Sequence, residues 1–280
     1  MAPLGYKVFF SKRPGVGRDI PAGNDHLKWV PTTSTLIYGE RDAVLVDTQL
    51  TKAAGKELVD WVVDSGKNLT TIYITHAHGD HFYGNAALLE RFPEAKILAT
   101  PEVVAKMAEA ILPDGMDAFW RRLFPGEIPE KLVTAVALNE DHFTLEGEKL
   151  EVVRIGRTDT DESTALWVPA IELVVAGDAV YDNTHPYLGE SFSKQSRLEW
   201  IAALDKIAAL HPKIVVGGHS DPNKIFSPSA LHETKAYFKN LERLNKETSS
   251  PEELYTRMLE LYPDRLNVGS VWGAANLVKK

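Results

Sequence analysis

The sequence contains no cysteine among its 280 residues. Disulfide bonds, thiolate metal ligands and cysteine nucleophiles are therefore excluded, and any metal must be bound by histidine, aspartate or glutamate. Positive charge is also scarce, with 31 lysines and arginines against 39 aspartates and glutamates. Because affinity for nucleic acid comes mostly from lysine and arginine, we do not expect a nucleic acid as the partner.

Long apolar runs are absent as well. No stretch of the sequence approaches the roughly 20 apolar residues of a membrane-spanning helix. Residues 1–10 lack the basic head and apolar run that are typical of a signal peptide. We therefore expect a protein of the cytoplasm that has no membrane partner, and the sequence does not indicate its oligomeric state.

Short apolar stretches alternate with longer amphipathic ones along the chain. Residues 35–38 and 43–47 are typical of a hairpin, residues 52–64 have helical spacing, and residues 69–75 are typical of a strand. The middle of the chain is rich in candidate strands and the last third is more helical. We predict one α/β domain over residues 1–280, with sheets inside, helices outside and a helical C-terminal part from about residue 227.

The segment Thr75-His-Ala-His-Gly-Asp-His81 places three histidines and one aspartate in seven positions. Imidazole and carboxylate are the donors that zinc, manganese or iron take in proteins. In a loop that follows a strand, His76 and His78 can point to one metal, whereas Asp80 and His81 point to a second. A polar loop with histidines by chance is the alternative, and this density of donors disfavours it.

These residues resemble the metal-binding motif of the metallo-β-lactamase superfamily of hydrolases. Three further segments carry the resemblance, namely Val46-Asp47-Thr48, Val175-Ala-Gly-Asp178-Ala-Val-Tyr181 and Val215-Val-Gly-Gly-His219-Ser. The resemblance covers nearly the whole chain and implies a four-layer αββα sandwich, with two mixed β-sheets and helices on the outer faces. It also implies six metal ligands: His76, His78, Asp80, His81, Asp178 and His219.

The resemblance further implies metal-dependent hydrolysis of a small molecule, with one or two zinc ions per chain and iron or manganese less favoured. Zinc lowers the pKa of a bound water to about 7, so that a zinc-bound hydroxide can attack a carbonyl. We expect Asp80 to act as the catalytic residue that orients this nucleophile, and Asp178 to bridge two metals or complete one site. The expected substrate is a small cyclic amide or ester, a lactam or a lactone.

Three side chains near the motifs are candidate substrate contacts. His185 and Tyr187 follow the segment of Asp178, and Tyr83 follows the histidine motif. A loop at either place could overhang the metals. The alternative for each side chain is that it packs against the protein without touching a substrate.

One position departs from the pattern of the superfamily. The third histidine of the first metal site is expected in a Gly-His-Thr or Gly-His-Ser context, and here the segment reads Gly156-Arg157-Thr158. A guanidinium has no lone pair to offer a metal. Arg157 is therefore an altered ligand position, and we expect it to turn away and pair with an acid: Asp159, Asp161 or Glu162.

Three outcomes follow for the first metal site. The preferred one is a half-filled centre that binds fewer than two zinc ions, in which case Arg157→His would raise both metal content and hydrolysis. In the second, His142 or His185 replaces the missing donor. In the third, the chain is a natural or engineered variant with impaired activity, because one base change converts histidine to arginine.

Other functions remain open at this point. Thioester hydrolysis uses the same chemistry as lactam or lactone hydrolysis. A mononuclear iron dioxygenase would be coloured and rich in iron when purified. A metal-poor, non-catalytic binding protein would agree with the loss of a ligand at Arg157.

Overall fold

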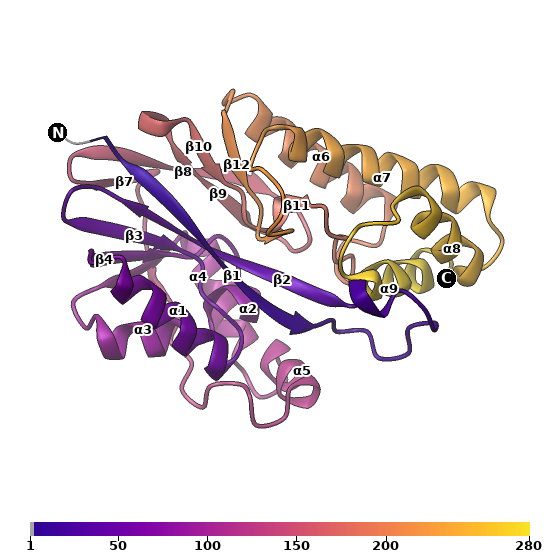
Figure 1. Cartoon of the computed structure of the whole chain (residues 1–280), viewed down its shortest axis with the longest axis horizontal. Helices are drawn as coiled ribbons and strands as arrows, with labels where there is room; N and C mark the ends of the chain where they lie inside the picture. The colour runs from indigo at the N-terminus through magenta and orange to yellow at the C-terminus, as the bar shows by residue number, and fades with distance from the viewer. Residues whose placement is uncertain (1–2) are drawn as a thin grey trace.

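The computed structural model describes residues 3–280 and contains two β-sheets that pack face to face (Figure 1). Helices cover the outer face of each sheet. A buried apolar layer that includes Ile37, Val44, Leu166 and Val175 fills the space between the sheets. The predicted four-layer αββα sandwich is therefore confirmed.

The first sheet comes from the N-terminal half of the chain and has the strand order β1-β2-β3-β4-β5-β6. Its strands are β1 (Gly5–Pro14), β2 (Trp29–Tyr38), β3 (Asp42–Val46), β4 (Asn68–Tyr73), β5 (Lys96–Ala99) and β6 (Val136–Ala137). The predicted hairpin is β2–β3, in which Thr35 lies opposite Val46. From β3 onward the neighbouring strands are parallel.

The second sheet has the strand order β12-β10-β9-β8-β7. Its strands are β7 (His142–Leu145), β8 (Glu148–Gly156), β9 (Ser163–Val168), β10 (Leu173–Val175) and β12 (Ile214–Val216). Only the pair β10–β12 is parallel. A separate short pair, β11 (Tyr181–Asp182) and β13 (His219–Ser220), lies beyond the ends of these two strands.

The helices form the two outer layers (Figure 1). Beside the first sheet lie α1 (Lys52–Asp64), α2 (Gly79–Phe82), α3 (Asn85–Arg91), α4 (Pro101–Ala110) and α5 (Met116–Leu123). Beside the second sheet lie α6 (Lys194–Ala208), α7 (Ser229–Glu247), α8 (Pro251–Leu261) and α9 (Val268–Val278). Short 3-10 turns occupy Asp25–Leu27, Pro169–Ile171 and Gly177–Ala179.

The helix boundaries agree with simple capping chemistry. The side chain of Thr100 accepts a hydrogen bond from the Val103 amide, and Ser250 does the same for Glu253. Each cap is followed by proline at the first helical position, where its missing N–H costs nothing. Among residues 3–280, no helix is both long and apolar enough to cross a membrane.

Candidate metal centre

The predicted donors meet at one edge of the sandwich because each follows the end of a parallel strand. The histidine motif follows β4, Asp178 follows β10, and His219 follows β12. Asp178 lies at the centre, with its carboxylate oxygens 3.9 Å from His76 Nε2, 3.2 Å from His81 Nε2 and 3.0 Å from His219 Nε2. The structure therefore brings together all six ligands that the sequence predicted.

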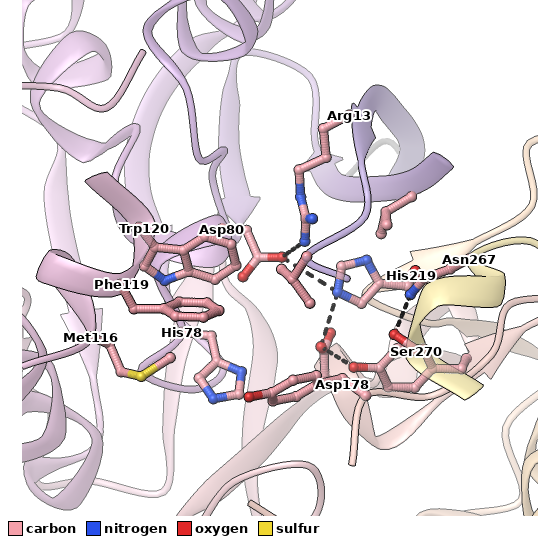
Figure 2. Close-up of a pocket in the computed structure, with 14 residues that line it drawn as sticks. Arg13, His78, Asp80, Met116, Phe119, Trp120, Asp178, His219, Asn267 and Ser270 are labelled. Atoms are coloured by element: carbon pink, nitrogen blue, oxygen red, sulfur yellow. Dashed lines mark hydrogen bonds and ion pairs between the residues drawn. The ribbon is translucent and has the colours of Figure 1, made fainter. Parts of the chain in front are cut away.

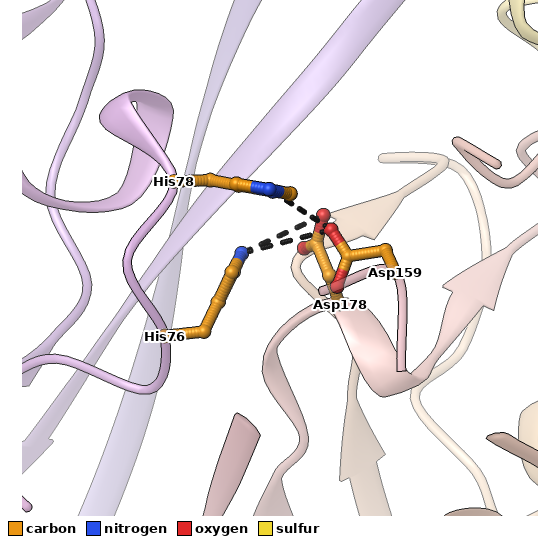
Figure 3. Close-up of side chains that lie close together, drawn as sticks. All are labelled: His76, His78, Asp159 and Asp178. Atoms are coloured by element: carbon orange, nitrogen blue, oxygen red, sulfur yellow. Dashed lines mark ion pairs between the residues drawn. The ribbon is translucent and has the colours of Figure 1, made fainter. Parts of the chain in front are cut away.

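The donors form three groups in each of which the ligand atoms lie within 4.8 Å of one another, and one of these consists of Asp47, His76 and His81. Donor group one contains His76, His78, Asp159 and Asp178 (Figure 3). Donor group two contains Asp80, His81 and His219. All of these residues are buried, and mixed imidazole and carboxylate donors suit zinc, manganese or iron.

A network around Asp47 orients two of the histidines. Asp47 accepts hydrogen bonds from the Thr75 amide (2.8 Å) and from the Thr75 hydroxyl (2.7 Å). His81 Nδ1 lies 3.1 Å from the same carboxylate, and His76 Nδ1 lies 2.9 Å from the Thr75 hydroxyl. Nδ1 of each ring is thus occupied, and Nε2 is directed to the cluster.

The other two histidines are anchored in the same manner by different acceptors. His78 Nε2 lies 2.8 Å from Glu190 Oε1, so its Nδ1 faces donor group one. His219 Nδ1 lies 2.6 Å from the Pro31 carbonyl, so its Nε2 faces Asp178. Such outer hydrogen bonds fix the tautomer and the orientation of histidines that bind metals.

Several atoms of the cluster are buried and have no hydrogen-bond partner among the described residues. They are His76 Nε2, His81 Nε2, Asp159 Oδ2 and Asp178 Oδ1. Buried polar atoms are normally paired, because leaving them unpaired costs free energy. A metal ion accepts lone pairs from such atoms, so the residues present fit a metal centre.

Close packing of the backbone holds Asp178 in place. A Cβ atom added to Gly218 would lie 2.0 Å from Asp178 Oδ1 and 2.9 Å from the His81 ring. Only glycine can therefore occupy this position while Asp178 and His81 keep their places.

Arg157 lies outside both donor groups. Its guanidinium pairs with Asp161 at 2.5 Å and with Glu199 at 3.3 Å. The prediction that Arg157 turns away to an acid is confirmed for Asp161. Just before Arg157, Gly156 has a φ of 91° beside an irregularity in the pairing of β8 with β9.

Asp159 is the donor that sequence reasoning missed. The sequence predicts Asp159 only as an ion-pair partner of Arg157. In the structure its side chain is fully buried beside His76 and His78. Its Oδ2 lies 2.8 Å from His78 Nδ1 and 3.9 Å from His76 Nε2. The feature of the sequence that could have indicated this donor is a carboxylate two residues beyond the expected histidine position.

The candidate substrate contacts have different outcomes. Tyr187 lines the cleft beside His78, and its contact with a substrate stays a prediction. His185 is fully buried with its Nδ1 2.9 Å from the Tyr237 hydroxyl, and Tyr83 is fully buried against Phe82. Neither lines the cleft, because both point into the apolar layers. His142 lies far from the cluster beside Asp141, so neither His142 nor His185 is a replacement donor.

An open cleft leads to the donors (Figure 2). It encloses about 450 Å³ of space, its mouth included. Met116, Phe119 and Trp120 of the α5 region form an apolar wall beside His78. Asn267 and Ser270 at the start of α9 lie on the other side, so the C-terminal helices contribute to the cleft.

Arg13 on β1 is a second residue that the sequence did not single out. Its Nη2 lies 2.6 Å from Asp80 Oδ2, and its guanidinium lies 5.4 Å from the Trp120 ring. Burial acts to raise the pKa of Asp80, but Arg13 and then His81 outweigh it and hold that pKa below its ordinary value. Asp80 is therefore ionised and available as a metal ligand.

The charges of donor group one differ from those of donor group two. Burial raises the pKa of Asp159 to about 6. Burial opposes protonation of His78, yet Asp159 and Glu190 outweigh it and hold the pKa of His78 well above its ordinary value. The carboxylates of Asp159 and Glu190 thus favour a positive charge at His78.

Comparison with known proteins places this geometry in a family. The model of the metallo-beta-lactamase superfamily matches residues 27–219, which is more than half of the chain. A metallo-beta-lactamase type 2 from Bacteroides fragilis is 26% identical over 197 residues, covering 69% of this chain and 70% of the relative. A hydroxyacylglutathione hydrolase from Parasynechococcus marenigrum is 30% identical over 80 residues, covering 29% of this chain and 28% of the relative.

Solved structures have the same fold. A metallo-beta-lactamase family protein from Thermus thermophilus superposes with a TM-score of 0.64 at 24% identity, covering 96% of this chain and 91% of that one. A metallo-beta-lactamase from Pontibacter korlensis gives a TM-score of 0.62 at 19% identity, covering 86% and 96%. Together with the family match and the donor cluster, these findings show that the chain belongs to the metallo-beta-lactamase superfamily of metal-dependent hydrolases.

Proposed function

We propose that the chain opens a small cyclic amide or ester, a lactam or a lactone, in a reaction that depends on metal bound at the two donor groups. The observation that carries this proposal is the position of the donors at the floor of a cleft that has one apolar wall.

Different residues of the cleft bind different parts of the substrate. The aromatic side chains of Phe119 and Trp120 pack against the apolar part of a ring substrate. Tyr187 closes the cleft next to His78. Arg13 lines the cleft as a cation beside Asp80 and can pair with an anionic substituent of the substrate.

The chemistry requires a nucleophile held against the carbonyl. Zinc, when bound, supplies an activated water and a Lewis acid for the carbonyl oxygen. His76, His78 and Asp178 would hold the first metal, and Asp80, His81, His219 and Asp178 the second. Asp80 is the catalytic residue that orients the attacking water, and Tyr181 donates a hydrogen bond of 2.6 Å that fixes Asp178.

Thioester hydrolysis is a second candidate. Hydroxyacylglutathione hydrolases are relatives at 30% identity, although the matches cover about a third of this chain or less. Lactamases match over about two thirds of the chain, which is why we place ring opening first. A metal-poor binding protein is less well supported, because Asp159 offers a carboxylate to donor group one beside His76 and His78.

A comparison of substrates tests the proposed function. The purified protein, with its metal content measured for zinc, iron and manganese, is assayed with a chromogenic β-lactam, an aryl lactone and S-lactoylglutathione. We expect kcat/KM for one of the cyclic substrates to exceed that for the thioester at least about tenfold. Asp80→Asn should lower kcat by about 10²–10⁴-fold, the range for loss of a positioned catalytic group.

Two results would contradict the proposal. A thioester preferred over both cyclic substrates would establish the second candidate instead. A coloured, iron-rich protein that consumes oxygen and hydrolyses none of the three would establish the dioxygenase interpretation.

A further inference from the structure

We propose that Asp159 is the third protein ligand of the first metal site, in the position where the superfamily has a histidine. Both sites would then be complete in this chain, in place of the half-filled centre that the sequence predicts. This inference rests on the proposal that the donor groups hold metal, and it concerns which residues of this chain do so.

The spacing of the atoms fits one shared metal. Ligand atoms about 2.0–2.2 Å from a tetrahedral metal lie about 3.3–3.6 Å from one another. In donor group one, His78 Nδ1 and Asp159 Oδ2 are 2.8 Å apart, and His76 Nε2 is 3.9 Å from both Asp159 Oδ2 and Asp178 Oδ2. These separations lie on either side of the expected value, and Figure 3 shows the four side chains converging.

The direction of the Asp159 carboxylate points to the same conclusion. Its Oδ1 accepts a hydrogen bond from the Thr158 hydroxyl at 2.9 Å, which fixes the side chain. Its Oδ2 is buried and has no hydrogen-bond partner among the described residues. His78 Nδ1 lies 2.8 Å from Oδ2 and His76 Nε2 lies 3.9 Å from it, so the three atoms face a common point.

The local backbone explains why position 159 and not position 157 reaches this point. Gly156, with a φ of 91°, ends β8 and turns the chain. After this turn Arg157 remains half-buried at the rim, whereas Thr158 and Asp159 are fully buried. The Thr158 amide then donates to the Thr160 carbonyl at 2.9 Å and closes the loop around Asp159.

A carboxylate in this position changes the charge of the centre. Donor groups one and two together hold three carboxylates, those of Asp80, Asp159 and Asp178, instead of two. Two divalent ions would therefore retain one positive charge less than in a centre with histidine at this place. Because oxygen ligands suit manganese and imidazole suits zinc, Asp159 should shift the preference of the first site toward manganese.

The test measures metal binding and not turnover. Zinc, manganese and cobalt uptake are measured by equilibrium dialysis for the full chain and for Asp159→Asn, Asp159→His and Arg157→His. The visible spectrum of the cobalt forms reports the ligands. Circular dichroism and thermal unfolding of the metal-free proteins show whether each variant folds.

We expect the unmodified chain to bind two equivalents of zinc and Asp159→Asn to bind one of them at least about tenfold more weakly. Asp159→His should keep two equivalents, change the cobalt spectrum and bind zinc more strongly relative to manganese. Arg157→His should match the unmodified chain. If Asp159→Asn does not fold, Asp159→His decides the matter through its cobalt spectrum and its metal preference.

Three results would overturn the assignment. The first is an unchanged cobalt spectrum in Asp159→His, and the second is undiminished zinc binding in a folded Asp159→Asn. The third is a single equivalent in the unmodified chain that rises to two in Arg157→His. If the metal results are as expected but no cyclic substrate or thioester is hydrolysed, the proposed function fails while the assignment of Asp159 stands.

Discussion

Asp178 belongs to donor group one and also lies 3.2 Å from His81 and 3.0 Å from His219 of donor group two, but the charges around the two groups differ. Donor group one contains the carboxylates of Asp159 and Asp178, and the Glu190 carboxylate lies 2.8 Å from His78 on its outer side. Donor group two has Asp80, and this carboxylate is already paired at 2.6 Å with the guanidinium of Arg13. One group is therefore surrounded by acids and the other has a resident cation.

This difference indicates an order of metal binding. At an effective dielectric near 20, two unit charges about 5 Å apart interact with roughly 3 kcal/mol, attractive or repulsive according to sign. Glu190 thus favours a cation in donor group one, whereas Arg13 opposes one in donor group two. We expect the first equivalent of metal to enter donor group one.

The largest effect is expected from the residue that both groups share. Asp178→Asn removes the carboxylate that faces His76, His81 and His219. Since a lost outer hydrogen bond alone costs about 10–100-fold in metal affinity, we expect both equivalents to weaken by more than about 100-fold. Isothermal titration with zinc measures this, with Asp182→Asn, a buried aspartate outside both groups, as the control. If only one equivalent of zinc bound more weakly, Asp178 would not contribute to both metal sites.

A smaller effect, confined to the first equivalent, is expected for Glu190→Gln. The change removes the charge that holds His78 Nε2 while keeping the shape of the side chain. We expect the first equivalent to bind about 10–100-fold more weakly and the second to be unaffected. The matched control is Glu199→Gln, which alters a partner of Arg157 and no histidine. Equal weakening of both equivalents would show that the groups are not independent.

Arg13→Gln should have an effect of the opposite sign, confined to the second equivalent. Removing the guanidinium beside Asp80 removes a repulsion, so we expect the second equivalent to bind about tenfold more tightly. Arg18→Gln is the control, because Arg18 donates to the carbonyls of Gly15 and Leu123 and to no metal donor. Weaker binding in Arg13→Gln would mean that Arg13 chiefly orients Asp80.

The smallest effect is expected for Arg157→Gln. Its partners Asp161 and Glu199 are largely exposed, and ion pairs of this kind contribute about 0–1 kcal/mol. We expect the free energy of unfolding in urea to fall by less than about 1 kcal/mol and the metal content to stay the same. A loss of one metal equivalent in this variant would show that Arg157 contributes to metal binding.

The resemblance to the superfamily predicts the layers and the six candidate donors, and local patterns in the sequence carry that resemblance. Apolar stretches with turn residues place Asp47, His76, Asp178 and His219 directly after strands, and parallel strands carry their ends to the same edge. The density of donors in the segment 75–81 is specific enough to identify the motif without any knowledge of distant contacts.

The sequence does not predict the third donor of the first site, because that depends on one turn. Whether residue 157 or residue 159 faces inward is set by the backbone at Gly156 and by the irregular pairing of β8 with β9. Arg13 is missed for another reason: its partner Asp80 is 67 residues away on a different element. Likewise, the burial of His185 against Tyr237 follows from the packing of α7, which no local pattern reveals.

The most direct test of the central claim is anomalous diffraction at the zinc edge from crystals of the unmodified chain grown with zinc. We predict two peaks per chain, one of them about 2.0–2.2 Å from Asp159 Oδ2 and close to His76 and His78. A single peak among Asp80, His81 and His219, with Asp159 not coordinating any metal, would contradict it.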